Sequence, residues 1–285
     1  MKESYTITFL TPCFCSGAQQ NIAEARASAI RGELRWWFRV LGGSREEERK
    51  VFGGLDPKGK PLGSSFRVRF FFEKESSERW WEKKLRTFGD AYLWHFLEAS
   101  RPSRWQEKGA IAPGSTCLIE LFWQRDPGQW GQGVFTRWSA AKEAFLHFGS
   151  LGYRATRCAG AFQWSGAPTT EEEWKRKIEE LLRPAGFRFD FPQGVCAGDW
   201  RGLIQKAEQY LKNLREKYPA RKGSKPTPLG LDSPRQRSAL LLRPVQVASA
   251  LTKYRLLVLE APHSRVLGEE TRSVWPTGPI LEQLA

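Results

Sequence analysis

The 285-residue chain contains three histidines, one methionine and five cysteines, and it has no long hydrophobic run. No apolar stretch approaches the ~20 residues of a membrane-spanning helix, and the first residues lack the apolar core of a signal peptide. We therefore expect a cytoplasmic protein with no membrane partner. The odd number of cysteines includes no CxxC pair, so neither a disulfide framework nor a zinc ribbon is indicated. No GxGxxG motif or P-loop is present, and we expect no cofactor and no bound metal.

Positive charge is abundant. The 45 lysines and arginines outnumber the 31 aspartates and glutamates, which gives a formal net charge of +14. Thirteen tryptophans and eighteen phenylalanines accompany this charge. We expect most of these aromatic residues in the core. Cations together with aromatic faces for base stacking are nevertheless typical of RNA-binding proteins. An anionic membrane is the less favoured partner, because no segment forms a long lysine-rich amphipathic helix.

The first part of the chain alternates between strand and helix patterns. Apolar and polar residues alternate over 5–10, 65–73 and 115–123, which predicts strands, and 160–164 is expected to be a fourth strand. Helical periodicity predicts helices over 25–41 and 139–148. If the predicted helix at 78–100 is an insertion, the order is β-α-β-β-α-β. This order predicts an α+β, ferredoxin-like fold of the kind that RNA-recognition (RRM-like) domains share.

The pattern of the sequence changes in residues 166–285. We expect helices at 171–182 and 199–218 and strands at 238–242 and 254–259, with a basic, proline-rich, mobile loop at 219–237. We predict two domains, an RRM-like domain over 1–165 and a smaller α+β lobe over 166–285. Whether this lobe is a second, degenerate RRM-like domain stays open at this point.

The first candidate binding feature is a row of arginines on the predicted helix 25–41. Arg31, Arg35 and Arg39 are four residues apart and share one helical face. Ser28 lies near the helix N-terminus, where backbone N–H groups can bind phosphate. Gln19 and Asn21 occupy the preceding turn and could contact ribose or phosphate. The alternative is a solvated face that pairs with acidic residues elsewhere.

The second candidate is a glycine-rich loop, residues 149–161. Gly152 and Gly160 allow close approach of a backbone, Arg154 and Arg157 add charge, and Tyr153 offers a stacking face. A helix end followed by a hairpin also needs glycines, so this pattern alone is weak. Both candidates can line one groove in a βαββαβ fold.

Five stretches resemble the sequence motifs of a known family. Residues 29–39 (AIRGELRWWFR) resemble the signature of the first Cmr subunit, a RAMP-superfamily member of type III-B CRISPR effector complexes. Three further stretches are similar to that family: its opening strand and glycine turn at 9–18, its Phe-Gly element at 51–54 (VFGG) and its glycine-rich loop at 151–157. Residues 237–243 resemble its late Arg-x-x-Ser-Pro-Leu strand, which adds Arg237 and Ser238 to the candidate site. Cys158 stands where the family has glycine, and Ala239 where it has proline.

The resemblance implies a non-catalytic subunit with RRM-like domains that functions in antiviral defence. Such a subunit holds the 3′ part of the guide RNA together with the bound target RNA, and it contacts other Cmr subunits. The acid that cuts the target belongs to neighbouring backbone subunits.

The alternative function is a RAMP-type endoribonuclease that processes or cuts RNA. The candidate general acids or bases are the three histidines, His95, His147 and His263, and each is better explained as a packing or surface residue. Glu24 and Asp56 have no partner carboxylate at a convincing spacing, and Asp56 before Pro57 indicates a turn. We therefore expect no catalytic residue in this chain.

Overall fold

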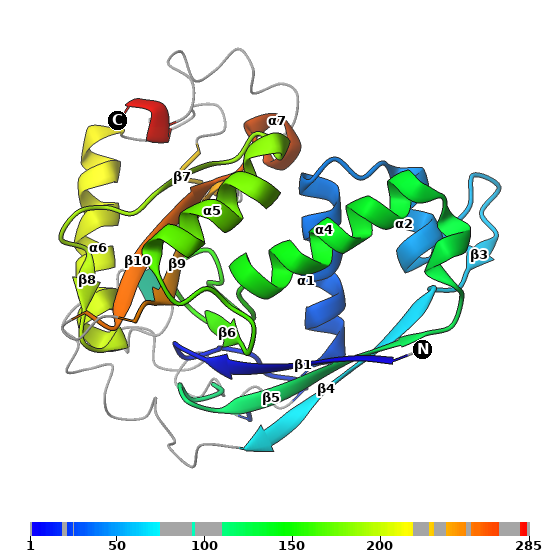
Figure 1. Cartoon of the computed structure of the whole chain (residues 1–285), viewed down its shortest axis with the longest axis horizontal. Coiled ribbons are helices and arrows are strands. Elements are labelled where there is room, and N and C mark those ends of the chain that lie inside the picture. The colour runs from blue at the N-terminus through cyan, green and yellow to red at the C-terminus, as the bar shows by residue number, and fades with distance from the viewer. Residues whose placement is uncertain are drawn as a thin grey trace.

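The computed structural model describes residues 2–18, 22–24, 26–74, 93–94, 110–218, 228–230, 238–248, 252–267 and 280–283. It confirms the α+β class. The first sheet has the strand order β4-β5-β1-β6, and every neighbouring pair is antiparallel. Its strands are β1 (Lys2–Phe9), β4 (Phe66–Lys74), β5 (Thr116–Trp123) and β6 (Phe162–Trp164). The helices α1 (Ala27–Val40) and α4 (Gln132–Phe148) lie on one face of this sheet (Figure 1).

This strand order is the ferredoxin-like arrangement expected from the sequence. β1 and β4 are joined through α1 and flank β5, whereas β5 and β6 are joined through α4 and flank β1. The two strands of each strand–helix–strand unit are therefore not adjacent, and a strand of the other unit lies between them. The predicted helix at 78–100 lies outside the described residues, apart from Leu93 and Trp94.

Helix α1 forms for the reason that its sequence suggests. Ile30, Leu34, Trp37 and Phe38 are buried along one stripe against the sheet and α4. The helix ends where Gly42 adopts φ +96°, and the N–H groups of Gly42 and Gly43 bond back to the carbonyls of Arg39 and Phe38. This is the glycine-terminated helix end that the sequence predicts.

The segment 45–65 contains a helix and a hairpin, whereas the sequence predicts only a loop over 53–65. Helix α2 (Arg45–Phe52) begins at a capping box, in which Ser44 and Glu47 satisfy each other's backbone N–H groups. A small hairpin of β2 (Gly54–Leu55) and β3 (Pro61–Leu62) follows it. Helix α4 likewise begins at Gln132 rather than at 139, after the 3-10 turn η3 (Pro127–Trp130).

The second sheet is built around β10 (Tyr254–Glu260). β9 (Leu240–Gln246) pairs with one edge of β10, and the short strands β7 (Arg188–Asp190) and β8 (Cys196–Ala197) pair with the other. Helices α5 (Glu171–Leu181) and α6 (Trp200–Lys217) confirm the two helices predicted there. The remaining short elements are η4 (Arg183–Ala185), α7 (His263–Val266) and η6 (Ile280–Gln283). Within the described ranges, no helix combines the length and apolarity needed to cross a bilayer.

The two sheets share a continuous interior. One hydrophobic cluster contains Ile7 and Trp37 from the first half of the chain and Leu257 and Leu259 from β10. Arg243 of β9 crosses this junction, where its guanidinium donates to the carbonyls of Gly149 and Phe162, the latter at 2.6 Å. Burial lowers the pKa of Arg243 to about 9. The division into domains at residue 165 stays a prediction.

We expect Arg243→Met to lower the free energy of unfolding by at least about 2 kcal/mol. Two buried carbonyls lose their donors, and each such loss costs about 1–3 kcal/mol. Urea denaturation measures this effect, with Arg176→Met as the control, because Arg176 is an exposed arginine of α5. Equal stability of the two variants would show that Arg243 does not hold the junction together.

Candidate nucleic-acid interface

The arginine row of α1 faces helix α2 and its acidic residue Glu48. Arg39 Nη2 donates to Glu48 Oε1 at 2.7 Å, and Arg35 Nε lies 3.1 Å from the same oxygen. The Glu48 side chain is 10% exposed, whereas that of Arg39 is 58% exposed. The pairing with Glu48 raises the pKa of Arg39. Arg35 and Arg39 therefore pair with an acidic residue elsewhere in the chain, which is the alternative given above for the arginine row.

Arg31 and Arg35 also bind the C-terminal end of α2. Arg31 Nη2 donates to the Phe52 carbonyl, and Arg35 Nη2 lies 3.4 Å from that carbonyl and 3.3 Å from the Gly53 carbonyl. Cations at a helix C-terminus complement its dipole. Desolvation and then the nearby charge of Arg35 lower the pKa of Arg31. All three arginines of the row, including Arg39 through Glu48, thus have a structural role in joining α1 to α2.

The N-terminal end of α1 is open to solvent. Ser28 is exposed, and Arg26 at the N-cap position donates to the Ser16 carbonyl across a short hairpin. The backbone of Glu24 bonds to Cys15 and the Ser16–Ala23 bridge closes this hairpin. Gln19 and Asn21 lie outside the described residues.

The glycine-rich loop packs against the segment that follows β1. The Tyr153 N–H donates to the Phe14 carbonyl at 2.8 Å, and the Gly160 N–H donates to the Pro12 carbonyl at 2.8 Å. Gly152 has φ +83°, and a Cβ there would lie 2.6 Å from the Phe14 oxygen. Glycine is therefore required at this position by both conformation and space.

Three predicted RNA contacts in and near this loop are buried, and for them a direct contact with RNA does not fit the structure. Arg157 is 6% exposed, and it donates to the carbonyls of Leu229 at 2.7 Å and Leu240 at 3.2 Å. Gly160 is buried, and a Cβ would lie 1.8 Å from the Leu151 oxygen. Ser238 donates to the Pro228 carbonyl and is 7% exposed. These residues hold the loop and the second sheet together. Arg237 lies outside the described residues.

Tyr153 and Arg154 differ from these buried neighbours. Tyr153 is 48% exposed and Arg154 is half-buried with φ +61°, so the loop presents an aromatic ring and a guanidinium together. An aromatic ring can stack on a base, and a guanidinium can bind phosphate. Together with exposed Gly152, they are the part of the predicted loop site that solvent reaches.

Cys158, at a position where the family motif has glycine, adopts a left-handed backbone conformation. Its φ is +65°, a region that costs an L-residue about 1–2 kcal/mol. Its N–H donates to the Leu242 carbonyl and its carbonyl accepts from the Thr11 hydroxyl at 2.6 Å. The thiol is buried, and desolvation raises its pKa.

The candidate acid–base residues take structural positions. His147 is 4% exposed, its Nδ1 lies 2.8 Å from the Glu143 carbonyl, and desolvation lowers its pKa to about 4. His263 Nε2 lies 2.7 Å from Glu260 Oε1, and His95 lies outside the described residues. Asp56 accepts from the N–H groups of Lys58 and Lys60, which confirms the predicted turn. Among the described residues, no group of three or more metal-ligating side chains is arranged to hold an ion.

The sequence model of the RAMP superfamily matches residues 6–163, more than half of the chain. The chain belongs to the RAMP superfamily. The matched region begins in β1 and ends in β6, so it contains α1 and the glycine-rich loop.

The individual relatives to which the chain is similar include Cmr proteins. The CRISPR system Cmr subunit Cmr1-2 of Pyrococcus furiosus is 31% identical over 65 residues, which is 20% of this chain and 35% of that relative. This match therefore spans about a third of the relative's length. The crystal structure of apo Cmr1 from Pyrococcus furiosus superposes with a TM-score of 0.60 at 19% identity, covering 92% of this chain and 88% of that one. A chain of the type III-B Cmr-beta complex bound to cognate target RNA gives a TM-score of 0.55 at 12% identity, covering 90% and 94%.

Two residues that organise this RAMP site were not identified as important from the sequence. Glu48 lies in an acidic run that resembles a solvated helix end, and Arg243 lies in an otherwise apolar strand. A lone arginine within the run Leu240–Gln246 is itself a signal, since a buried strand accommodates a cation only where it meets hydrogen-bond acceptors. No comparable signal distinguishes Glu48 from Glu46 and Glu47.

We expect Glu48→Gln to destabilise this RAMP protein by about 1–3 kcal/mol, because hydrogen bonds to charged groups contribute about that much. Glu46→Gln is the matched control, since Glu46 is 69% exposed and pairs with Lys50 one turn away. Thermal unfolding of both variants measures the difference. Equal melting temperatures would mean that the α1–α2 contact does not depend on Glu48.

The lowered pKa of His147 predicts that the free energy of unfolding depends on pH in the acid range. The unfolded chain binds a proton at this residue below about pH 6.5, whereas the folded protein binds it only below about pH 4. The free energy of unfolding therefore falls as the pH drops between these values. Denaturation at pH 7, 6, 5 and 4.5 should show a shallower decline for His147→Phe than for the wild type, and parallel profiles would contradict the assignment.

Proposed function

We propose that this chain is a cytoplasmic, non-catalytic RNA-binding subunit of a type III-B CRISPR effector complex. In this role it would hold the 3′ part of the guide RNA and the bound target RNA, next to other Cmr subunits. The observation that carries the proposal is the match to the Cmr1 crystal structure over 92% of the chain, in a protein of the RAMP superfamily. The net charge of +14 supports RNA as the partner.

The proposed contact surface lies at the end of β1 where the chain enters α1. Tyr153 and Arg154 of the glycine-rich loop and Ser28 at the start of α1 supply a stacking ring, a cation and a helix N-terminus. Arg39, the most exposed arginine of the row, lies in the last turn of α1, about 16 Å along the helix from Ser28, and would extend this surface. These groups suit recognition of RNA backbone and shape, because base pairing with the guide supplies the sequence specificity of such complexes.

The placement of the histidines supports the non-catalytic part of the proposal. His147 is 4% exposed and has a pKa of about 4, so at neutral pH its ring is uncharged, and its Nδ1 is engaged with the Glu143 carbonyl. His263 is engaged with Glu260, whose carboxylate also accepts from the backbone of Ile280 and Leu281. Both are positions that stabilise the fold.

The test is affinity purification of the tagged chain from cells that contain its native neighbours, followed by sequencing of the bound RNA. We expect guide RNAs that carry repeat sequence, together with several other proteins. Tyr153→Ala combined with Arg154→Ala should reduce RNA recovery several-fold while leaving thermal stability unchanged, because base stacking and a phosphate contact contribute about 1–3 kcal/mol each. Recovery of the wild-type chain alone, or with unrelated RNA, would refute the proposal.

A further inference from the structure

The side of the first sheet that faces away from α1 and α4 carries an unusual combination of side chains. Strand alternation directs Phe66, Phe70, Cys117 and Ile119 into the core beneath the helices, so their neighbours in the strands point to the opposite side. We name that opposite side the open face. Its members are Lys2, Ser4, Thr6, Thr8, Arg67, Arg69, Phe71, Leu118, Glu120 and Phe122.

The strand register arranges these residues in rows across the sheet. One row is Arg67, Phe122 and Lys2, the next is Arg69, Glu120 and Ser4, and the third is Phe71, Leu118 and Thr6. Directly opposed side chains in a sheet lie about 5 Å apart, so each row forms one contiguous strip. Aromatic rings, cations and hydroxyl groups thus occupy adjacent positions on one flat surface.

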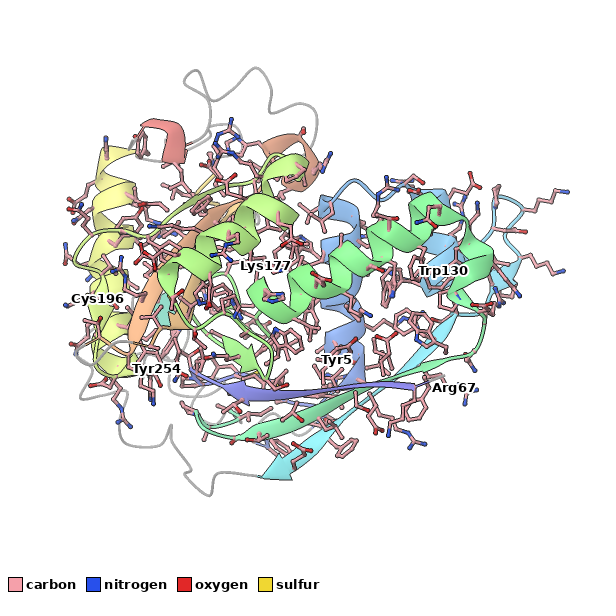
Figure 2. The ribbon with its side chains drawn as sticks, in the orientation of Figure 1. Tyr5, Arg67, Trp130, Lys177, Cys196 and Tyr254 are labelled. Carbon is pink, nitrogen blue, oxygen red and sulfur yellow. The ribbon has the colours of Figure 1, made fainter. Side chains whose placement is uncertain are left out.

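Two rings of the open face carry the apolar part of this surface. Phe71 is 41% exposed, which is unusual for a large apolar side chain in a regular strand. The Phe122 ring lies between cations: Arg69 Cζ is 4.8 Å and Lys2 Nζ is 5.6 Å from its centroid. In Figure 2, Tyr5 lies on the helix side of the sheet and Arg67 at its outer end.

The charge of the open face is positive at its β4 edge. Glu120 is 5% exposed and forms an ion pair with Lys2, which neutralises the centre. Arg67 is steadied by Gln124, whose side-chain oxygen accepts from Arg67 Nε at 2.8 Å. The guanidinium groups of Arg67 and Arg69 therefore make the charge along the edge strand β4 positive. Glu73 follows them at the bulge where the pairing of β4 with β5 shifts.

We propose that the open face is a second RNA-binding surface, on which single-stranded RNA stacks its bases against Phe71 and Phe122 while Arg67 and Arg69 bind its phosphates. Rings on a flat sheet can stack on successive bases without reading their sequence, and flanking arginines neutralise the backbone. The hydroxyl groups of Ser4 and Thr6 lie within the same rows and can bond to ribose or phosphate oxygens. This surface lies on the other side of the sheet from α1, and it does not depend on membership of a Cmr complex.

The first experiment measures binding of a fluorescently labelled, mixed-sequence single-stranded RNA to the full chain by anisotropy. Phe71→Ala should weaken binding by about 5-fold to 100-fold, with an unchanged salt dependence, because stacking is lost and no charge is removed. Phe135→Ala is the matched control: Phe135 is also 41% exposed but lies on α4, and its loss should leave the affinity unchanged. Thermal unfolding of both variants verifies that they fold.

The second experiment separates charge from stacking. Arg69→Ala should weaken binding and reduce the slope of log affinity against log salt by about 0.7, the value for one phosphate contact on a single strand. Arg176→Ala removes an exposed arginine of α5 and should change neither the affinity beyond about 2-fold nor the slope. Ultraviolet cross-linking followed by mass spectrometry should place RNA on the peptides that contain Phe71 or Phe122.

The outcomes distinguish this proposal from the proposed function. Loss of binding in Tyr153→Ala and Arg154→Ala with full binding in Phe71→Ala and Arg69→Ala would overturn the second surface and retain the first. The reverse pattern would retain the open face alone. Wild-type RNA affinity in the open-face variants, accompanied by loss of a protein neighbour from the purified complex, would overturn the proposal and assign the open face to a protein contact.

Discussion

The buried guanidinium of Arg243 is the contact on which the arrangement of the candidate interface depends. It joins β9 to the carbonyls of Gly149, where the glycine-rich loop begins, and of Phe162, where β6 begins. Backbone bonds from Cys158 to Leu242 and from Leu242 to Thr156 hold the middle of the same loop. A buried cation is stable only where oxygen atoms surround it, so the chain must bring these carbonyls together for the fold to form. The second sheet therefore holds the loop of the first sheet in place.

Much of the positive charge that suggests RNA binding has a structural role. Arg35 and Arg39 pair with Glu48, Arg31 binds the end of α2, and Arg157 is enclosed by carbonyls. A guanidinium has five N–H donors in a rigid plane, which allows one side chain to satisfy several carbonyls of a loop at once. Net charge is accordingly a poor guide to which arginines contact a nucleic-acid partner.

The first sheet has two distinct sides because strand alternation separates its side chains. On one side the phenylalanines and tryptophans pack beneath α1 and α4, and on the other Phe71 and Phe122 share the surface with arginines and hydroxyl groups. The glycine-rich loop packs against Pro12 and Phe14, just after β1, whereas β1 itself contributes Ser4 and Thr6 to the open face. An RNA strand that contacts both would pass around the end of β1, next to the Phe14–Tyr153 bridge.

Local patterns were sufficient to predict most elements of this RAMP protein from its sequence, including the βαββαβ order, the glycine end of α1 and the capped helix α5, because propensity and periodicity act over a few residues. The family motif at 29–39 was likewise readable along the chain. Helix α2 was missed because its eight residues contain one turn of apolar side chains at most. The burial of Arg157 and Ser238, the pairing of Glu48 with α1 and the left-handed conformation of Cys158 were decided by tertiary structure. Each depends on carbonyls or side chains that are distant in sequence, and no local pattern records which partner a polar group meets when the two sheets pack together.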